Sequence, residues 1–117
     1  VRIAIDEAVV VAADPVLLHS SLVNLLANAL AHARSRVDVS VSVDGHWVSV
    51  RVHNDGPSID EAVRARVFEP FFTTRPRGTG LGLAIVRRNL AAFDGEVKLE
   101  EDSPGVSFTI RLRRWEG

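Results

Sequence analysis

The apolar and polar residues of this chain alternate with two periods, and the period changes several times along the sequence. A period of two is typical of a strand with one buried face, whereas apolar residues three and four apart are typical of an amphipathic helix. The first pattern predicts strands at residues 1–5, 9–12, 37–43, 48–52, 96–101 and 106–112. The second predicts helices at 15–34, near 60–67 and at 82–93. This order favours an α+β two-layer sandwich, with helices on one face of a mostly antiparallel sheet.

The clearest local signal is a hairpin of alternating valines around the dipeptide Asp44-Gly45. Asp-Gly is a preferred two-residue turn, and such a turn pairs Val41 with Val48 and Val39 with Val50. All the valines then share one face, and we expect the long helix to cover it. That helix should begin at Asp14-Pro15, a capping residue followed by proline, and the last helix should end at Gly95.

Composition narrows the class of protein. The 117 residues are 46% hydrophobic with a formal net charge of -1, which fits one domain spanning residues 1–117 and offers no basic surface for nucleic acid. Cysteine is absent, so thiolate metal sites and cysteine nucleophiles are excluded. No apolar run is long enough for a membrane span, and we expect no direct membrane contact. Because methionine is also absent, we interpret the chain as a fragment of a longer protein.

The long helix carries an unusual polar stripe. Ser20, Asn24, Asn28 and His32 are four residues apart and therefore lie above one another. A solvent-exposed face is the ordinary explanation, but such a face normally uses Glu, Lys and Arg, whereas Asn disfavours helix interiors. Amide oxygens are competent Mg²⁺ ligands, so the stripe could hold a metal-bound polyphosphate.

Three loop motifs add candidates. The glycines of "RGTGLGLAIV" precede a helix whose first-turn amides form an anion site, although a glycine-rich turn alone is a weak signal. The run "VHNDGPSID" is explained equally well by a turn or by an oxygen acceptor for the exocyclic amine of adenine. The run "VFEPFFTTRPRG" holds Phe68, Phe71 and Phe72, which we expect to pack this loop onto the core.

Taken together, these stretches resemble the ATP-binding catalytic domain of sensor histidine kinases, in the superfamily of gyrase B, mismatch-repair ATPases and large heat-shock chaperones. "NLLANALAH" resembles the N box, "NDGPSI" the first glycine box, "FEPFFT" the F box and "GTGLGLAIV" the second glycine box. The resemblance covers nearly the whole chain. It implies a mixed sheet covered on one face by three helices, with ATP between the long helix and a lid at about residues 69–79.

The resemblance also implies roles for individual residues. Asn28 would be the Mg²⁺ ligand, Asn24 would support the phosphates, and His32 would lie near the phosphates or ribose. Asn54 would contact the adenine amine, and Gly56 would allow close approach to the base. The remaining nucleotide-binding positions are Ser58, Gly78, Thr79, Gly80, Leu81 and Gly82.

The sequence departs from the family pattern at Asn54, usually aspartate, and at Ser58, usually glycine. Asn54 keeps an oxygen acceptor, so adenine recognition should survive. Asp55 does not take the place of the family's aspartate, because alignment on Gly56-Pro57 makes it the neighbouring residue. In ATP-hydrolysing relatives a glutamate acts as general base one turn before the metal-binding asparagine. Asn24 occupies that position here and cannot accept a proton, so we expect Mg·ATP to be bound without rapid hydrolysis.

The resemblance predicts transfer of the γ-phosphoryl group to a histidine on a separate dimerisation segment, and then signalling to a response regulator. His19, His32, His46 and His53 all lack the acidic residue and downstream proline of such an acceptor. The domain would be cytoplasmic, in a parent that is often membrane-anchored. Two alternatives stay open: a serine kinase of the anti-sigma-factor type, and a degenerate binding module.

Overall fold

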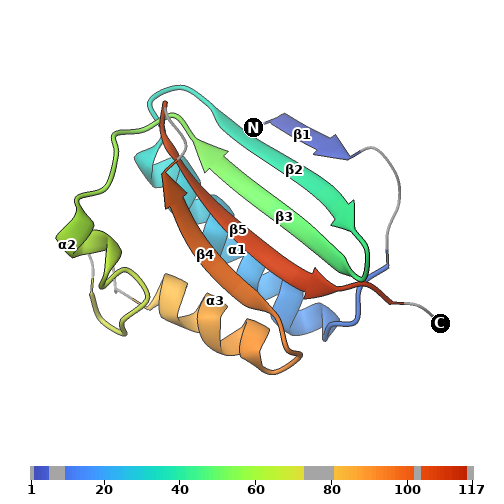
Figure 1. The fold of residues 1–117 in the computed structure, drawn as a ribbon. Helices are drawn as coiled ribbons and strands as arrows, with labels where there is room; N and C mark the ends of the chain where they lie inside the picture. The colour runs from blue at the N-terminus through green and yellow to red at the C-terminus, as the bar shows by residue number, and fades with distance from the viewer. Residues whose placement is uncertain (1, 6–9, 73–80, 102–103, 116–117) are drawn as a thin grey trace.

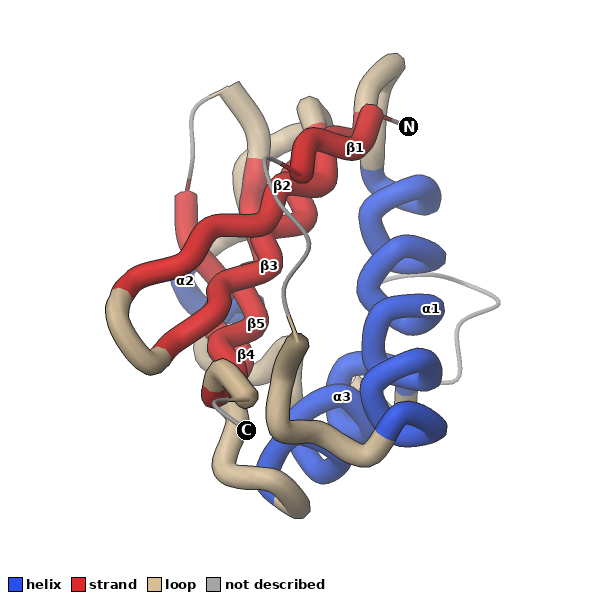
Figure 2. Tube along the Cα trace, turned by 90° about the vertical axis from the view of Figure 1, so that its right-hand side faces the viewer, coloured by secondary structure: helices blue, strands red, loops and turns tan. Residues whose placement is uncertain are grey.

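The chain forms two layers, a five-stranded sheet and two helices packed on one of its faces (Figures 1 and 2). The computed structural model describes residues 2–5, 10–72, 81–101 and 104–115, with side chains from residue 10 onward. The strand order is β1-β2-β3-β5-β4. β1 runs parallel to β2, and the other neighbours are antiparallel. The predicted α+β sandwich with a mixed, mostly antiparallel sheet is confirmed.

The elements follow the predicted order, with boundaries that differ by a few residues. The strands are β1 (Arg2–Ile5), β2 (Val37–Asp44), β3 (Trp47–Asn54), β4 (Glu96–Glu101) and β5 (Val106–Arg113). The helices are α1 (Pro15–His32), α2 (Glu61–Arg64) and α3 (Gly82–Ala91). Asp14 caps α1 by accepting hydrogen bonds from the amides of Val16 and Leu17, as the Asp-Pro pair predicts.

The β2–β3 hairpin forms, but its predicted register is wrong by two residues. Asp44 pairs with Trp47, and Gly45 and His46 make the turn, so Val41 pairs with Val50 instead of Val48. Gly45 adopts φ +61°, which explains why a glycine is needed there. A shift of two residues leaves every side chain on its original face, so the valines still share one face of the sheet.

Two further predictions are corrected. Residues 10–12 of the expected strand at 9–12 do not form one; Val11 makes only an isolated bridge to Arg114. At the end of α3, the left-handed residue is Asp94, with φ +60°, and not Gly95. The amide of Gly95 then donates to the carbonyl of Leu90 at 2.8 Å, which closes the helix end as a Schellman motif one residue earlier than expected.

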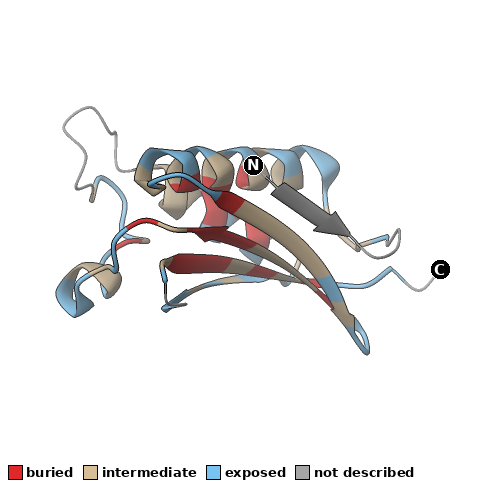
Figure 3. Ribbon diagram, turned by 90° about the horizontal axis from the view of Figure 1, so that it is seen from above, coloured by how far each residue is buried: buried red, intermediate tan, exposed pale blue. Residues whose placement is uncertain are grey.

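The core lies between the sheet and the two long helices, where the buried residues gather (Figure 3). Leu25 and Ala29 of α1 and Val86 and Leu90 of α3 meet the inward side chains of β2, β3 and β5. The short helix α2 lies beyond the sheet end where β3 and β4 finish, and Arg64 reaches Glu101 there at 3.6 Å (Figure 1). Among the described helices, none has the length and apolar content that a bilayer crossing needs.

The outward face of the sheet carries an aromatic and basic cluster at the end of the β2–β3 hairpin. The guanidinium carbons of Arg111 and Arg113 lie 4.2 and 4.9 Å from the centroid of the Trp47 ring. Arg111 also approaches Glu96 at 3.7 Å. This cluster lies at the start of β3, at the opposite end of the strand from Asn54.

Candidate functional site

The two asparagines of α1 lie in different surroundings. The side-chain nitrogen of Asn24 donates to the carbonyl of Ser20 at 2.9 Å. The oxygen Oδ1 of Asn28 is buried and has no hydrogen-bond partner. A buried acceptor without a partner costs free energy on the order of 1 to 3 kcal/mol, so such an atom calls for a ligand. Asn28 is therefore the member of the stripe best suited to accept one.

The start of α3 lies against the same stripe. A methyl group added at Gly82 would come 3.1 Å from Oδ1 of Asn24, so the small residue allows the two helices to approach there. Leu81, at the N-cap position, makes no side-chain cap to the first turn of α3. First-turn amides that a side chain does not cap are suited to an anion. The structure thus brings Asn24 and the α3 N-terminus together.

Asn54 and Gly56 lie where β3 ends beside the last turn of α1. Asn54 is 2% exposed, and its Oδ1 accepts from the amide of Gly56 at 2.9 Å, which leaves a second lone pair on that oxygen. A side chain at Gly56 would overlap the carbonyl oxygen of His32. The structure therefore brings Asn54, Gly56 and the His32 backbone together, whereas Ser58 is exposed.

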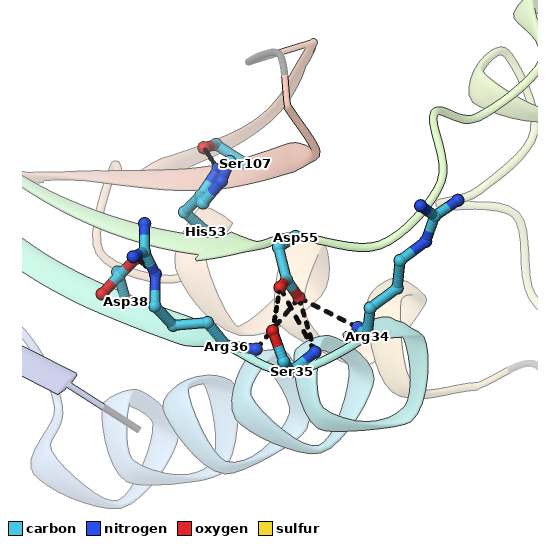
Figure 4. A network of polar contacts seen from close by, with 7 residues as sticks. All are labelled: Arg34, Ser35, Arg36, Asp38, His53, Asp55 and Ser107. Atoms are coloured by element: carbon cyan, nitrogen blue, oxygen red, sulfur yellow. Dashed lines mark hydrogen bonds and ion pairs between the residues drawn. The ribbon is translucent and has the colours of Figure 1, made fainter.

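Asp55 is the centre of a dense hydrogen-bond network (Figure 4). In the sequence it was only the neighbour of Asn54, with no role of its own. Its carboxylate accepts from the backbone amides of Arg34, Ser35 and Arg36 at 2.9 to 3.2 Å and from the Ser35 hydroxyl at 2.6 Å. These bonds, the Ser35 hydroxyl first, hold the pKa of Asp55 well below its usual value. We call this set of residues, 34–36 and Asp55, the Asp55 clamp.

The phenylalanine motif packs onto the core through one ring only. Phe68 meets Phe108 edge-to-face, with ring centroids 6.0 Å apart. Phe72 lies under the guanidinium of Arg66, and Phe71 is 74% exposed with a left-handed backbone, φ +67°. The expectation that these rings pack the loop onto the core is therefore confirmed for Phe68 and wrong for Phe71 and Phe72. The predicted lid is described only as far as residue 72, and Gly78, Thr79 and Gly80 lie outside the described residues.

A metal bound here would depend mainly on groups other than the protein. Over the described ranges, no three His, Cys, Asp or Glu side chains are grouped so as to hold a metal ion. Mg²⁺ is commonly bound through one or two protein oxygens together with substrate phosphates and water. A single buried amide oxygen at Asn28, one helical turn along α1 from the Asn24 side chain that faces the start of α3, fits that mode.

Comparison with known families supplies the class to which this fold belongs. Residues 13–116 match the model of the "Histidine kinase-, DNA gyrase B-, and HSP90-like ATPase" family. The chain belongs to this family.

Within the family, the similar proteins are sensor histidine kinases. The chain is 42% identical over 105 residues to the signal transduction histidine-protein kinase AfsQ2 of Streptomyces coelicolor, covering 85% of the chain and 20% of that protein. It is 39% identical over 108 residues to the sensor histidine kinase CpxA of Escherichia coli K12, covering 87% and 23%. The chain thus spans about a fifth to a quarter of these relatives.

Solved structures of histidine kinases share this fold. The catalytic domain of the histidine kinase ThkA superposes with a TM-score of 0.87 at 31% identity, covering 96% of this chain and 76% of that one. Full-length ShkA, solved in complex with AMPPNP, superposes with a TM-score of 0.84 at 31% identity, covering 99% and 26%. The chain is therefore homologous to histidine kinase catalytic domains in both sequence and fold.

Proposed function

We propose that the chain is the ATP-binding catalytic domain of a longer sensor histidine kinase, and that it binds Mg·ATP for transfer of the γ-phosphoryl group to a histidine. Membership of the ATPase family and homology to sensor kinases support the class of reaction. The AMPPNP complex of ShkA supports a nucleoside triphosphate as ligand. Such a domain would work on the cytoplasmic side, where ATP is found.

The observation that carries this proposal is the buried, unpartnered Oδ1 of Asn28. A Mg²⁺ ion arriving with ATP would give this oxygen the partner that it lacks in the protein. Bound there, the ion would neutralise charge on the phosphates. A hard oxygen ligand at Asn28, one helical turn along α1 from Asn24 and the α3 N-terminus, favours a polyphosphate over a simple anion.

The other residues divide between the two ends of the nucleotide. Asn54 would accept from the adenine amine through its remaining lone pair, and Gly56 would let the base approach. Asn24 and the first turn of α3 would face the phosphates, with His32 between the two ends. Gly78, Thr79, Gly80, Leu81 and Ser58 complete the proposed contacts. Because Asn24 cannot act as a base, hydrolysis should be slow, and the acceptor would supply its own nucleophile.

The phosphoryl acceptor and the protein partners are inferred from the same class of protein, the sensor histidine kinases. We infer that the phosphoryl group passes to a dimerisation segment of the same protein and then to a response regulator. The serine-kinase alternative is separated by treating the phosphorylated acceptor with acid. Phosphohistidine loses its label, whereas phosphoserine keeps it. Retention of the label would favour the serine kinase.

The test of the site is Asn28→Ala, assayed by titrating the chain with a fluorescent ATP analogue with Mg²⁺ and with EDTA. Removal of the proposed ligand should weaken Mg²⁺-dependent binding on the order of tenfold or more, with little change in EDTA. His19→Ala, an exposed substitution on the same helix, is the control and should bind like the wild type. Unchanged Mg²⁺-dependent affinity in Asn28→Ala would show that the site has been misassigned.

A further inference from the structure

The Asp55 clamp joins two segments that carry opposite ends of the proposed nucleotide site. Its carboxylate belongs to the residue between Asn54 and Gly56, at the adenine end. Its donors belong to residues 34–36, which directly follow the last turn of α1. The backbone adds a further bond, because the amide of Asp55 donates to the carbonyl of Arg36 at 3.2 Å. Side chain and main chain therefore fix the same two segments together.

Close packing on both sides reinforces this junction. On one side, Gly56 lies against the carbonyl of His32, so a side chain there would overlap the end of α1. On the other side, Gly105, at φ +112°, lies against the carbonyl of Asn54, where a side chain would also overlap. The peptide between Asn54 and Asp55 is thus held between the α1 terminus and the β4–β5 turn.

The charge at this position needs compensation, which the clamp provides. The C-terminal end of a helix carries partial negative charge, and an acidic side chain near it is unfavourable. Three successive amides and one hydroxyl around the Asp55 carboxylate offset that repulsion, in the manner of an anion-binding nest. A residue placed against the helix dipole and held by five hydrogen-bond contacts is a strong geometric constraint.

The constraint reaches the metal end through α1 itself. Asn28 lies one helical turn before His32, whose carbonyl contacts Gly56. Since a hydrogen-bonded helix moves as a unit over one turn, fixing residues 32–36 relative to Asn54 also fixes Asn28 relative to Asn54. The spacing between the adenine contact and the metal ligand then depends on the clamp.

We propose that Asp55 is a positioning residue that sets the spacing between the adenine end and the metal end of the nucleotide site. This inference rests on the function proposed above. It assigns Asp55 no contact with the nucleotide. It predicts that loss of the carboxylate weakens the binding of ligands that contact both ends of the site more than the binding of ligands that contact one end.

The test compares Mg·ATP with adenosine on the 117-residue chain, using Asp55→Asn and Asp44→Asn. Asp44→Asn is the matched control. It makes the same change at an exposed aspartate that ends β2, at the opposite end of the β2–β3 pair from Asp55. We expect Asp55→Asn to raise the Kd for Mg·ATP about tenfold, as expected for losing hydrogen bonds to a charged group, and the Kd for adenosine by less than about threefold. Asp44→Asn should bind both ligands like the wild type.

Each outcome has a separate meaning. If wild-type chain binds no Mg·ATP, the proposed function itself fails. If wild type binds and Asp55→Asn binds both ligands equally well, with only a lower melting temperature, the clamp is a stability feature and the inference is overturned. An equal rise in the Kd for adenosine and for Mg·ATP also overturns the inference, because the spacing between the two ends would then be irrelevant.

A second variant covers the case in which Asp55→Asn does not fold. Ser35→Ala removes the 2.6 Å hydroxyl bond and keeps the three amides. It should shift the Kd for Mg·ATP in the same direction, about two- to threefold, as expected for one hydrogen bond. An unchanged Kd in Ser35→Ala would contradict the inference on its own.

Discussion

Gly56 shows how packing at one residue can underlie a binding motif. The family resemblance attributes this glycine to the approach of the adenine base. The structure adds a requirement within the protein, since the space that a side chain would occupy holds the carbonyl oxygen of His32. The glycine is therefore needed even before a nucleotide binds. Its replacement should disturb both folding and the site.

We predict that Gly56→Ala lowers the stability by about 2 kcal/mol or more, because the backbone must move away from the end of α1. It should also weaken Mg·ATP binding. Urea denaturation and nucleotide titration measure the two effects. Gly45→Ala is the control: at φ +61° in open space it should cost roughly 1 to 2 kcal/mol and leave nucleotide affinity unchanged. Wild-type affinity in Gly56→Ala would contradict this account.

At the same scale, the sequence could suggest Asn28 but not the role of Asp55. Asn28 is a candidate from the sequence because two asparagines at helical spacing are unusual for a solvent-exposed face. The partners of Asp55 lie 19 to 21 residues away, across the whole β2–β3 hairpin. Their contact depends on the hairpin register, which the sequence pattern did not determine. An acidic residue directly after a strand was the only local signal.

At the scale of the element, periodicity predicted what each segment is, and turn geometry decided where it ends. Valine alternation identified both strands of the hairpin, yet the register followed from Gly45 and His46 forming the turn. The strand expected at 9–12 failed for a related reason. Residues 10–12 do pair with the end of β5, where Ala12 donates to the Arg113 carbonyl and Val10 accepts from the Trp115 amide, but the pairing amounts to a single bridge and is too short for a strand.

The end of α3 gives a prediction at this scale. Asp94 holds a left-handed backbone, which costs an ordinary residue roughly 1 to 2 kcal/mol and glycine almost nothing. Asp94→Gly should therefore raise the free energy of unfolding by roughly 0.5 to 1 kcal/mol, after the entropy cost of glycine in the unfolded chain. Chemical denaturation measures the change.

The control substitution lies two residues earlier. Ala92 has a right-handed backbone with φ -64°, so Ala92→Gly should lower the stability by about 1 kcal/mol. A loss of stability in both variants would show that the left-handed conformation at Asp94 carries no cost.

At the scale of the whole molecule, the proposed site is assembled from segments that are distant in sequence. The metal end comes from α1 and the start of α3, and the adenine end comes from the end of β3. The fold class was predictable because each layer has its own local pattern. The junction between the layers at Asn54 was not predictable from local patterns, because it requires α1, β3 and the β4–β5 turn to meet at one place.

The Asp55 carboxylate should also make the stability of the molecule depend on acid. Its pKa is lowered on folding from 3.8 in the unfolded chain, so its contribution is present above that pH and is lost as the pH falls through the folded value. We expect the difference in unfolding free energy between wild type and Asp55→Asn to be constant above about pH 5 and to shrink below about pH 4. Urea melts from pH 7 to acid measure this difference. A constant difference throughout would contradict the assignment.

The cluster around Trp47 has a practical consequence for optical measurements. The chain has two tryptophans. Trp47 begins β3, and Trp115 lies nearby, since Arg114 donates to the His46 carbonyl at 2.7 Å. Asn54 ends the same eight-residue strand, about 23 Å away at the rise of an extended chain. Indole emission thus comes from the end of the molecule remote from the proposed nucleotide, and a change in it reports unfolding at that end.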